Sequence, residues 1–238
     1  MLSEIYTGWR WPRVTGKIEH RPLDYPKIWR LAQARTRKPV RFGTCCSQVM
    51  GLFLDIHTTH YKDKREVLWD MAVAMNQELL ALRDAGCRCI QIEEPTLHFM
   101  ANTFGRDHDD VKFYLECYYP EAEGLENVEL WVHTCWGNPN MQRVIDNDSY
   151  AASLDMYMTQ ARGDVLTLET KDRDMRELEL LAPYMKAPRG KKVCIGVVSH
   201  RRLQVETPEE VAATIRQALR HIPPEKLILS TDWGFGGQ

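Results

Sequence analysis

The residues best suited to chemistry lie at the ends of short apolar runs. His133 ends the run 128–133 (VELWVH), Cys135 lies two positions further on, and Glu169 ends the run 165–169 (VLTLE). Residues i and i+2 of a strand share one face, so the imidazole and the thiol would point to one place. Zinc binds imidazole, thiolate and carboxylate groups, and three protein ligands with one open position are typical of catalytic zinc. The pattern predicts a zinc site; the alternative is a buried cysteine, a hydrogen-bonded histidine and a salt-bridged glutamate.

Two further features could act on a substrate. Glu93 and Glu94 follow an apolar run, and adjacent side chains of a strand face opposite ways, so only one of them can enter the site. There it would bind an ammonium group or act as a base; the alternative is a structural pair with one carboxylate at a helix N-terminus. His200 follows another run, where a loop histidine can donate a proton near neutral pH. The alternative for His200 is a solvated basic turn.

Cys45, Cys46 and Asp232 complete the candidates. Either cysteine could supply a further thiolate ligand, or both could pack. Asp232 ends the run 227–231 (LILST) and could orient a ligand histidine through a hydrogen bond or cap a backbone turn. The seven cysteines of the chain are odd in number and irregularly spaced, which favours reduced thiols over a disulfide framework.

Apolar runs alternate with segments of helical periodicity along most of the chain. This alternation predicts a parallel sheet. The carboxyl ends of its strands would gather the candidate residues at the mouth of a (β/α)8 barrel or along one edge of a doubly wound sheet. No G-x-G-x-x-G motif or P-loop follows the first strand, so nucleotide binding has no support. Strands are predicted at 39–44, 87–92, 128–133, 165–169, 193–198 and 227–231, and helices at 64–85, 107–118, 140–160, 172–186 and from Thr207 onward.

The composition excludes several classes of protein. The chain has 238 residues, of which 44% are hydrophobic and 27% charged, and this balance is typical of a globular protein. A formal net charge of −2 argues against a nucleic-acid or membrane-surface binder. No apolar run approaches the roughly 20 residues that span a bilayer, and the N-terminus has no signal-peptide layout. We therefore expect a cytoplasmic protein.

Five motifs, taken in order, resemble the catalytic barrel of cobalamin-independent methionine synthase. The resemblance runs from about residue 38 to 235. It implies a (β/α)8 barrel of the type shared with uroporphyrinogen decarboxylase, and zinc held by a histidine, a cysteine, a glutamate and a second cysteine. It also implies homocysteine bound as a thiolate and a reduced folate, methyltetrahydrofolate, as methyl donor. The motifs are IQIEEP at 90–95, HTCW at 133–136, the strand 166–169 that ends in Glu169, VETPEE at 205–210 and DWGF at 232–235.

The resemblance also implies roles for single residues. His133, Cys135 and Glu169 match three of the zinc ligands. Glu93 stands where the family has an aspartate that holds the amino group of homocysteine. His200 lies near the position of a histidine that protonates the departing folate nitrogen, although an ungapped match places the next residue, an arginine, there.

The sequence departs from the family at the substrate pockets. Trp233 occupies the position of the second cysteine ligand, and tryptophan cannot bind zinc. Cys45 and Cys46, the possible substitutes, replace a Gly-Pro pair near the folate site, and Glu93 is one methylene longer than aspartate. A different thiol acceptor, such as coenzyme M, or a different alkyl donor therefore remains open.

The six predicted strands match family strands three to eight, so we expect an α/β fold of the (β/α)8 type that is incomplete. Residues 1–37 would form an irregular N-terminal arm with a short amphipathic piece, and 38–238 the partial barrel. The open edges of such an arc need covering, so the chain would be a fragment, a truncated product, or part of a homo-oligomer or of an assembly with a barrel-completing chain.

Three functions follow from these patterns. The first, which we rank ahead, is zinc-dependent transfer of a methyl or other alkyl group to a thiol. The second is a non-catalytic, degenerate barrel that acts with a partner, which Trp233 and the missing strands favour. The third is a metal-free, decarboxylase-like barrel, which leaves His133, Cys135 and Glu169 without a role.

Overall fold

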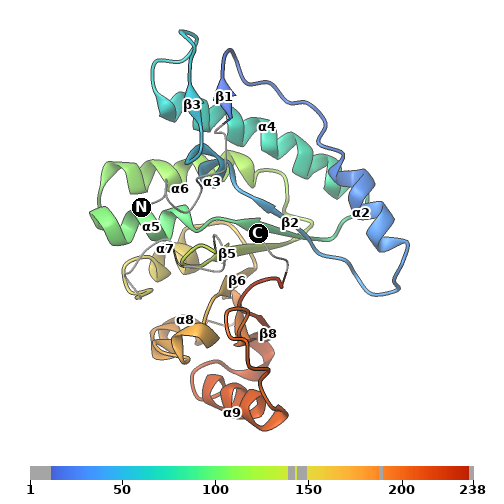
Figure 1. Cartoon of the computed structure of the whole chain (residues 1–238), viewed down its shortest axis with the longest axis vertical. Coiled ribbons are helices and arrows are strands. Elements are labelled where there is room, and N and C mark those ends of the chain that lie inside the picture. Colours follow the sequence, from blue (N-terminus) through green and yellow to red (C-terminus); the bar gives the residue numbers. More distant parts are fainter. Residues whose placement is uncertain (1–11, 139–142, 144–148, 188–189, 236–238) are drawn as a thin grey trace.

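Six parallel strands form the main sheet of the protein (Figure 1). The structure is a computed structural model that describes residues 12–138, 143, 149–187 and 190–235. The strand order is β2-β4-β5-β6-β7-β8, and every neighbouring pair is parallel. All six predicted strands are confirmed. Their bounds are β2 (Phe42–Cys45), β4 (Cys89–Glu93), β5 (Glu129–Thr134), β6 (Val165–Leu168), β7 (Lys192–Val198) and β8 (Leu227–Thr231).

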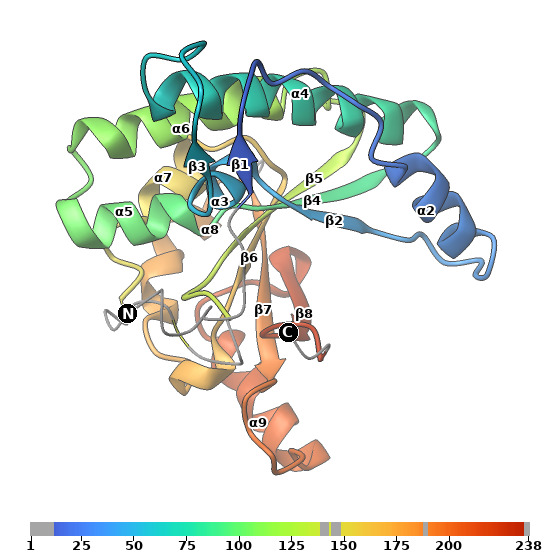
Figure 2. The ribbon, with the colours of Figure 1, turned by 45° about the horizontal axis from the view of Figure 1, so that its top comes forward.

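Helices connect the strands, and their ends follow local sequence signals. The Asp63 carboxylate accepts hydrogen bonds from the Arg65 and Glu66 amides in the first turn of α4, and Gly86, with φ of 106°, follows its last turn. Thr207 and Glu210 form a reciprocal capping box at α9. Helices α4, α5 and α6 cover one side of the sheet (Figure 2). The helices are α2 (Tyr25–Gln33), α3 (Ser47–Gly51), α4 (Lys64–Asp84), α5 (Thr96–Phe104), α6 (Asp109–Glu121), α7 (Leu154–Thr159), α8 (Ala182–Met185) and α9 (Pro208–Ala218).

Several elements differ from the sequence prediction. The helix predicted over 172–186 is wrong: 3-10 turns at Lys171–Arg173 and Leu178–Leu181 precede the short α8. Asp174, Met175 and Glu177 have positive φ values, which an α-helix does not allow. Of the helix predicted over 140–160 only α7 is seen; residues 139–142 and 144–148 lie outside the described residues.

The N-terminal segment and the first crossover hold elements that periodicity did not indicate. The short strands β1 (Arg13–Val14) and β3 (Asp55–Ile56) pair in parallel away from the main sheet. The amphipathic piece predicted in the arm is α2. Helices α3 and α5 were not predicted, because each is short and begins directly at a strand end. The boundary between an arm and a barrel domain stays a prediction.

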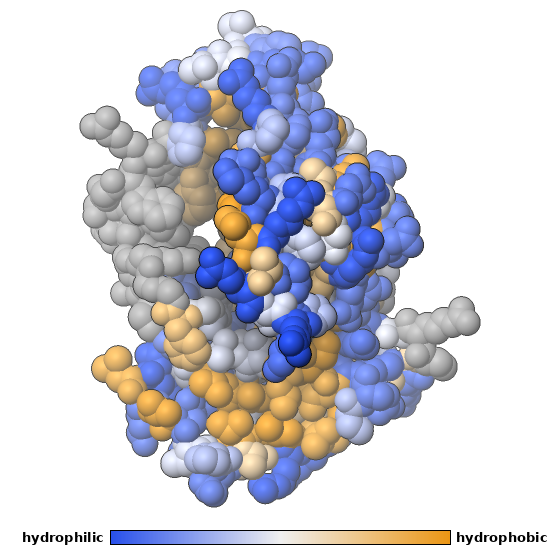
Figure 3. Space-filling view, turned by 90° about the vertical axis from the view of Figure 1, so that its right-hand side faces the viewer, coloured by the Kyte–Doolittle hydropathy of each residue, from blue (hydrophilic) through white to orange (hydrophobic). Residues whose placement is uncertain are grey.

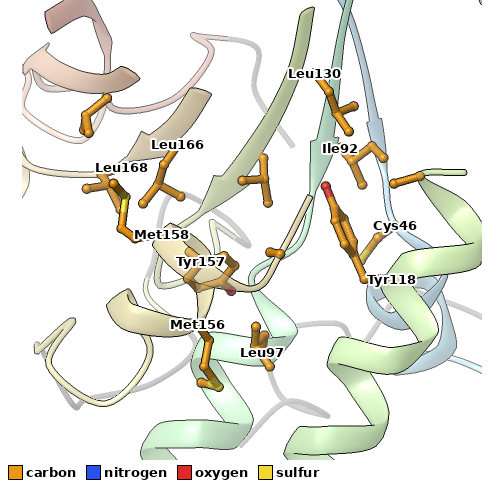
Figure 4. Close-up of a cluster of buried hydrophobic side chains, with 14 of the residues drawn as sticks. Cys46, Ile92, Leu97, Tyr118, Leu130, Met156, Tyr157, Met158, Leu166 and Leu168 are labelled. Carbon is orange, nitrogen blue, oxygen red and sulfur yellow. The ribbon is translucent and has the colours of Figure 1, made fainter. Parts of the chain in front are cut away.

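The two faces of the sheet have different neighbours. Ile90 and Ile92 of β4 belong to the large core between sheet and helices, part of which is drawn in Figure 4. Trp131, Val165 and Cys194 form a small separate cluster on the other face. We call this second face the inner face, because it corresponds to the side that a closed (β/α)8 barrel turns toward its axis.

The sheet is an open arc of the (β/α)8 type. Its order ends at β2 on one side and at β8 on the other, and within the described residues these two strands do not pair. Leu229 of β8 is 43% exposed. Figure 3 shows apolar surface toward the end of the molecule that carries β8 and α9. The prediction of an incomplete barrel is thus confirmed in the strand order.

Candidate metal and substrate site

His133 lies near the carboxyl end of β5, and its side chain is on the inner face of the sheet. It is 3% exposed, and neither Nδ1 nor Nε2 has a hydrogen-bond partner. Burial lowers the pKa of His133, against the opposing charge of Glu93, so the imidazole is neutral at pH 7. A buried polar atom without a partner is costly, and a neutral imidazole nitrogen is a zinc ligand. The geometry of His133 is therefore that of a free ligand.

Cys135 lies just beyond the end of β5 and is fully buried. Its Sγ accepts a hydrogen bond from the Gly137 amide at 3.3 Å. Burial and then the charge of Glu169 raise the pKa of the Cys135 thiol well above its usual range. The thiol is therefore protonated at neutral pH despite the charge of Arg201, and a further positive charge, such as a bound cation, would be needed to ionise it.

Glu169 is fully buried beside Cys135 and pairs with Arg201. Its Oε1 lies 3.3 Å from Arg201 Nη2, and its Oε2 accepts a hydrogen bond from the Trp136 amide at 3.3 Å. Burial raises the pKa of Glu169, and Arg201 opposes this rise. Arg201 Nη2 also donates to the Gly137 carbonyl at 2.9 Å, so this guanidinium ties together the loops after β5 and β6.

A different group of residues is the most compact candidate for a cation. Among the described residues, single ligand atoms of Asp172, His200 and Asp232 all lie within 4.8 Å of one another, whereas His133, Cys135 and Glu169 do not form such a group. Arg201 Nε lies 3.5 Å from Asp172 Oδ2 and supplies positive charge there already. The predicted zinc ligands thus lie at the carboxyl ends of neighbouring strands, but their ligand atoms are not within 4.8 Å of one another.

Asp232 caps the turn that follows β6. Its carboxylate accepts hydrogen bonds from the amides of Thr170, Lys171 and Asp172 at 2.7, 2.9 and 2.7 Å. Burial raises the pKa of Asp232 to about 7, against these three hydrogen bonds. A Cβ on Gly196 of β7 would lie 1.8 Å from Asp232 Oδ1. Glycine at position 196 is therefore what lets the carboxylate reach the turn.

His200 lies in the same region and is 3% exposed. Its Nε2 is 2.8 Å from Asn138 Oδ1, and its Nδ1 is 3.3 Å from Asp172 Oδ2. Burial and the charge of Arg201 lower the pKa of His200 to about 4, while Asp172 opposes the change. One proton between Nδ1 and Oδ2 would satisfy both atoms. The structure thus places His200 in a buried histidine–carboxylate pair and not in a solvated turn.

The Glu93-Glu94 pair divides between the two faces of the sheet. Both carboxylate oxygens of Glu94 lie 3.1 Å from the Leu97 amide nitrogen, which donates to them. Its Oε2 also accepts a hydrogen bond from the Tyr157 hydroxyl at 2.9 Å, so Glu94 caps α5. Glu93 lies on the inner face, where it stands opposite His133 in the β4–β5 register and Cys45 in the β2–β4 register. Of the two carboxylates, Glu93 is the one that enters the candidate site.

The two vicinal cysteines also point apart. Cys45 stands opposite Glu93 in the β2–β4 register, and partial burial of its thiol, together with the charge of Glu93, raises its pKa to about 11. Cys46 is buried in the core and its sulfur accepts the Val49 amide, so it caps α3. All seven cysteines are free of disulfides.

Trp233 lies against His133. The two rings meet edge to face with centroids 5.0 Å apart, and the indole Nε1 has no hydrogen-bond partner. Sequence patterns missed this contact, and they also missed the roles of Arg201 and Asp172. The run 199–202 (SHRR) follows a predicted strand and so indicated that basic residues lie at the site. No sequence pattern indicated which carboxylate each of them would contact.

Comparison with known proteins decides the family. The model of the cobalamin-independent synthase catalytic domain matches residues 30–236. The chain belongs to this family. The resemblance carried by the five motifs is thereby confirmed, and with it the expectation of a catalytic-domain relative.

The relatives are longer than this chain. A methionine synthase of Saccharolobus solfataricus is 32% identical over 179 residues, which are 75% of this chain and 47% of that protein. One of Sulfurisphaera tokodaii is 26% identical, over 75% of this chain and 46% of the relative. The chain thus spans about half the length of the curated relatives it matches.

Solved structures share the fold. A B12-independent methionine synthase from Shewanella sp. W3-18-1, solved in complex with selenomethionine, superimposes with a TM-score of 0.73 at 24% identity, over 94% of this chain and 63% of that one. A protein described as a putative vitamin-B12 independent methionine synthase from Listeria monocytogenes gives 0.70 at 19% identity, over 94% and 67%. Within the described residues, no helix is long and apolar enough to cross a membrane.

Proposed function

We propose that this chain carries a zinc-dependent site that transfers a methyl group from a reduced folate to a thiol such as homocysteine. Family membership supports methyl transfer. The observation that carries the zinc assignment is His133, whose two buried ring nitrogens have no partner. With Cys135 and Glu169 it makes a nitrogen, sulfur and oxygen donor set, which is the set that zinc takes in proteins.

The donor chemistry of these residues fits zinc, but their ligand atoms are not gathered around one point and one of them already has a partner. His133, Cys135 and Glu169 would hold the ion, which when bound would lower the pKa of a coordinated substrate thiol. Arg201 already neutralises Glu169, so guanidinium and metal would compete for that carboxylate. Cys45 is on the inner face beside Glu93 and is the candidate for a further sulfur ligand, whereas Cys46 is committed to capping α3.

The remaining groups of the site would bind substrate and supply a proton. Glu93 would hold the ammonium group of an amino-acid thiol, because its carboxylate lies on the inner face opposite His133. His200 would pass a proton to a departing nitrogen of the donor, and Asp172, whose Oδ2 lies 3.3 Å from Nδ1, would stabilise the transiently protonated ring. Asp232 would keep Asp172 in place through its amide. Reduced thiols of this kind suit the cytoplasm.

Metal content tests the proposal. Elemental analysis of the purified chain should give about one zinc per chain, and a chelator competition should give its affinity. His133→Ala and Cys135→Ala should each lose the metal. His57→Ala is the matched control, because the His57 side chain is about half exposed and pairs with the surface carboxylate of Asp55. If the wild-type protein binds no zinc when the free zinc concentration is sub-micromolar, the assignment is refuted.

Activity assays then separate the acceptors. Homocysteine with methyltetrahydrofolate should give methionine. An assay with coenzyme M as the acceptor tests whether Trp233 and Glu93, which differ from the family pattern, have changed the thiol that the site accepts. The open arc between β2 and β8 supports a second candidate, a barrel without activity of its own that is completed by another chain or copy. This candidate predicts stable association in sedimentation experiments and no turnover by the isolated chain.

A further inference from the structure

The strands β5 and β6 stop pairing just before Cys135 and Glu169, two of the proposed zinc ligands. Their last paired residues are Thr134 and Leu168. Cys135 and Glu169 follow immediately, where no ladder hydrogen bond fixes the distance between the strands. His133 bonds to the β4 side through its carbonyl, so the Thr134 carbonyl faces β6, and in a continued parallel ladder it would accept from the Glu169 amide. Among the described residues this backbone bond is not formed. Something other than the ladder must therefore hold the two strand ends.

The hydroxyl of Tyr150 takes the place of the missing ladder step. It accepts a hydrogen bond from the Glu169 amide at 3.1 Å. It lies 3.1 Å from the Glu169 carbonyl and 3.4 Å from the Thr134 carbonyl, to either of which it can donate. A hydroxyl has one donor and two acceptor sites, which suits these contacts. One side-chain atom thus connects the carboxyl ends of β5 and β6.

Tyr150 is itself held rigidly. Its backbone amide donates to Glu177 Oε2 at 2.9 Å. The centroid of its ring lies 4.3 Å from that of Trp136 and 5.1 Å from that of His98. The Arg173 guanidinium lies over both Trp136 and Tyr150, at 4.4 and 5.4 Å from the ring centroids. Arg173 is only 2% exposed and also bonds Glu177 at 3.2 Å. This buried packing leaves the tyrosine hydroxyl little freedom to move.

We propose that Tyr150 is a positioning residue that sets the separation of Cys135 and Glu169 through its hydroxyl group. The inference rests on the proposed function for its consequence, metal binding, but not for its structural content. Burial keeps the pKa of the Tyr150 hydroxyl well above its usual value, so the group retains the proton it donates. The Trp136 amide that contacts Glu169 Oε2 belongs to the same packed unit.

Tyr150→Phe tests this role, because it removes only the hydroxyl and keeps the packed ring. Tyr118→Phe is the matched control: Tyr118 is equally buried, and its hydroxyl donates to the Arg162 carbonyl at 3.0 Å, away from the site. The first readout is amide hydrogen exchange in metal-free protein. We expect exchange at Glu169 to rise at least tenfold, while the Thr170 amide, bonded to Asp232, stays protected.

The second readout is zinc affinity by chelator competition. Loss of a group that orients a metal ligand weakens binding by about 10–100-fold, and we expect this for Tyr150→Phe but not for Tyr118→Phe. If wild type binds no zinc, the proposed function fails, and Glu169 exchange still decides the role of Tyr150. Unchanged Glu169 exchange, or zinc affinity equal to that of the control, would overturn the inference. Should Tyr150→Phe not fold, Glu177→Gln, which weakens the anchor of Tyr150, must show the same changes to a smaller degree.

Discussion

Arg201→Met removes the positive charge that neutralises Glu169 and keeps most of the side-chain volume. Arg201 Nη2 lies 3.3 Å from Glu169 Oε1, and the two side chains are 14% and 0% exposed. Two unit charges at that distance attract by about 5 kcal/mol at an effective dielectric constant of 20. Breaking a buried pair of this kind destabilises a protein by about 3–5 kcal/mol, because it leaves an unpaired buried charge.

The expected result has two parts. At roughly 2–4 °C per kcal/mol for a chain of this size, metal-free Arg201→Met should melt about 10 °C below wild type. Zinc supplies the countercharge that the variant lacks, and free metal at 100 times Kd adds about 2.7 kcal/mol of stability. The increase in Tm on adding zinc should therefore be larger in the variant than in wild type, where metal and guanidinium compete for one carboxylate.

Arg202→Met is the matched control for this experiment. Arg202 is the neighbouring arginine, 47% exposed, and pairs with the exposed Asp174 at 2.8 Å. Surface pairs of this kind contribute about 1 kcal/mol or less, so its Tm should barely change. Differential scanning calorimetry with and without zinc measures all the differences. If Arg201→Met loses no more Tm than Arg202→Met, or gains no more from zinc than wild type, the reasoning is refuted.

Two further predictions follow from the site and the core. Trp233→Cys should tighten zinc binding at least tenfold in chelator competition, because a thiolate would replace the indole that lies on His133; Trp233→Phe, which adds no ligand, should not. Burial raises the pKa of Glu121 to about 7 from 4.5, so the folded protein holds an extra proton between these values and wild type should lose about 3 kcal/mol of stability as pH rises from 4.5 to 7. Urea unfolding at pH 5 and pH 8 should show this loss reduced in Glu121→Gln and unchanged in Glu116→Gln, whose side chain is exposed; an equal loss in all three proteins would contradict the assignment.

Local patterns were sufficient for the strands and for the capped helices. Apolar runs bounded by polar residues mark buried parallel strands, and the Asp63 and Thr207 caps act within their own first turns. The region 171–186 could not be predicted in this way. The Asp232 carboxylate, about 60 residues away, accepts hydrogen bonds from three amides at the start of this region. The positive φ values of Asp174, Met175 and Glu177 then turn the chain out of a helical path.

The sequence by itself determined that His133, Cys135, Glu169 and Glu93 stand at the carboxyl ends of parallel strands, because strand periodicity and βα alternation are local properties. Only the tertiary structure decided their partners. That Arg201 meets Glu169 and Trp233 meets His133 depends on the paths of loops that join different strands. These contacts lie 32 and 100 positions apart in the chain, and no local spacing encodes which side chains such loops bring together.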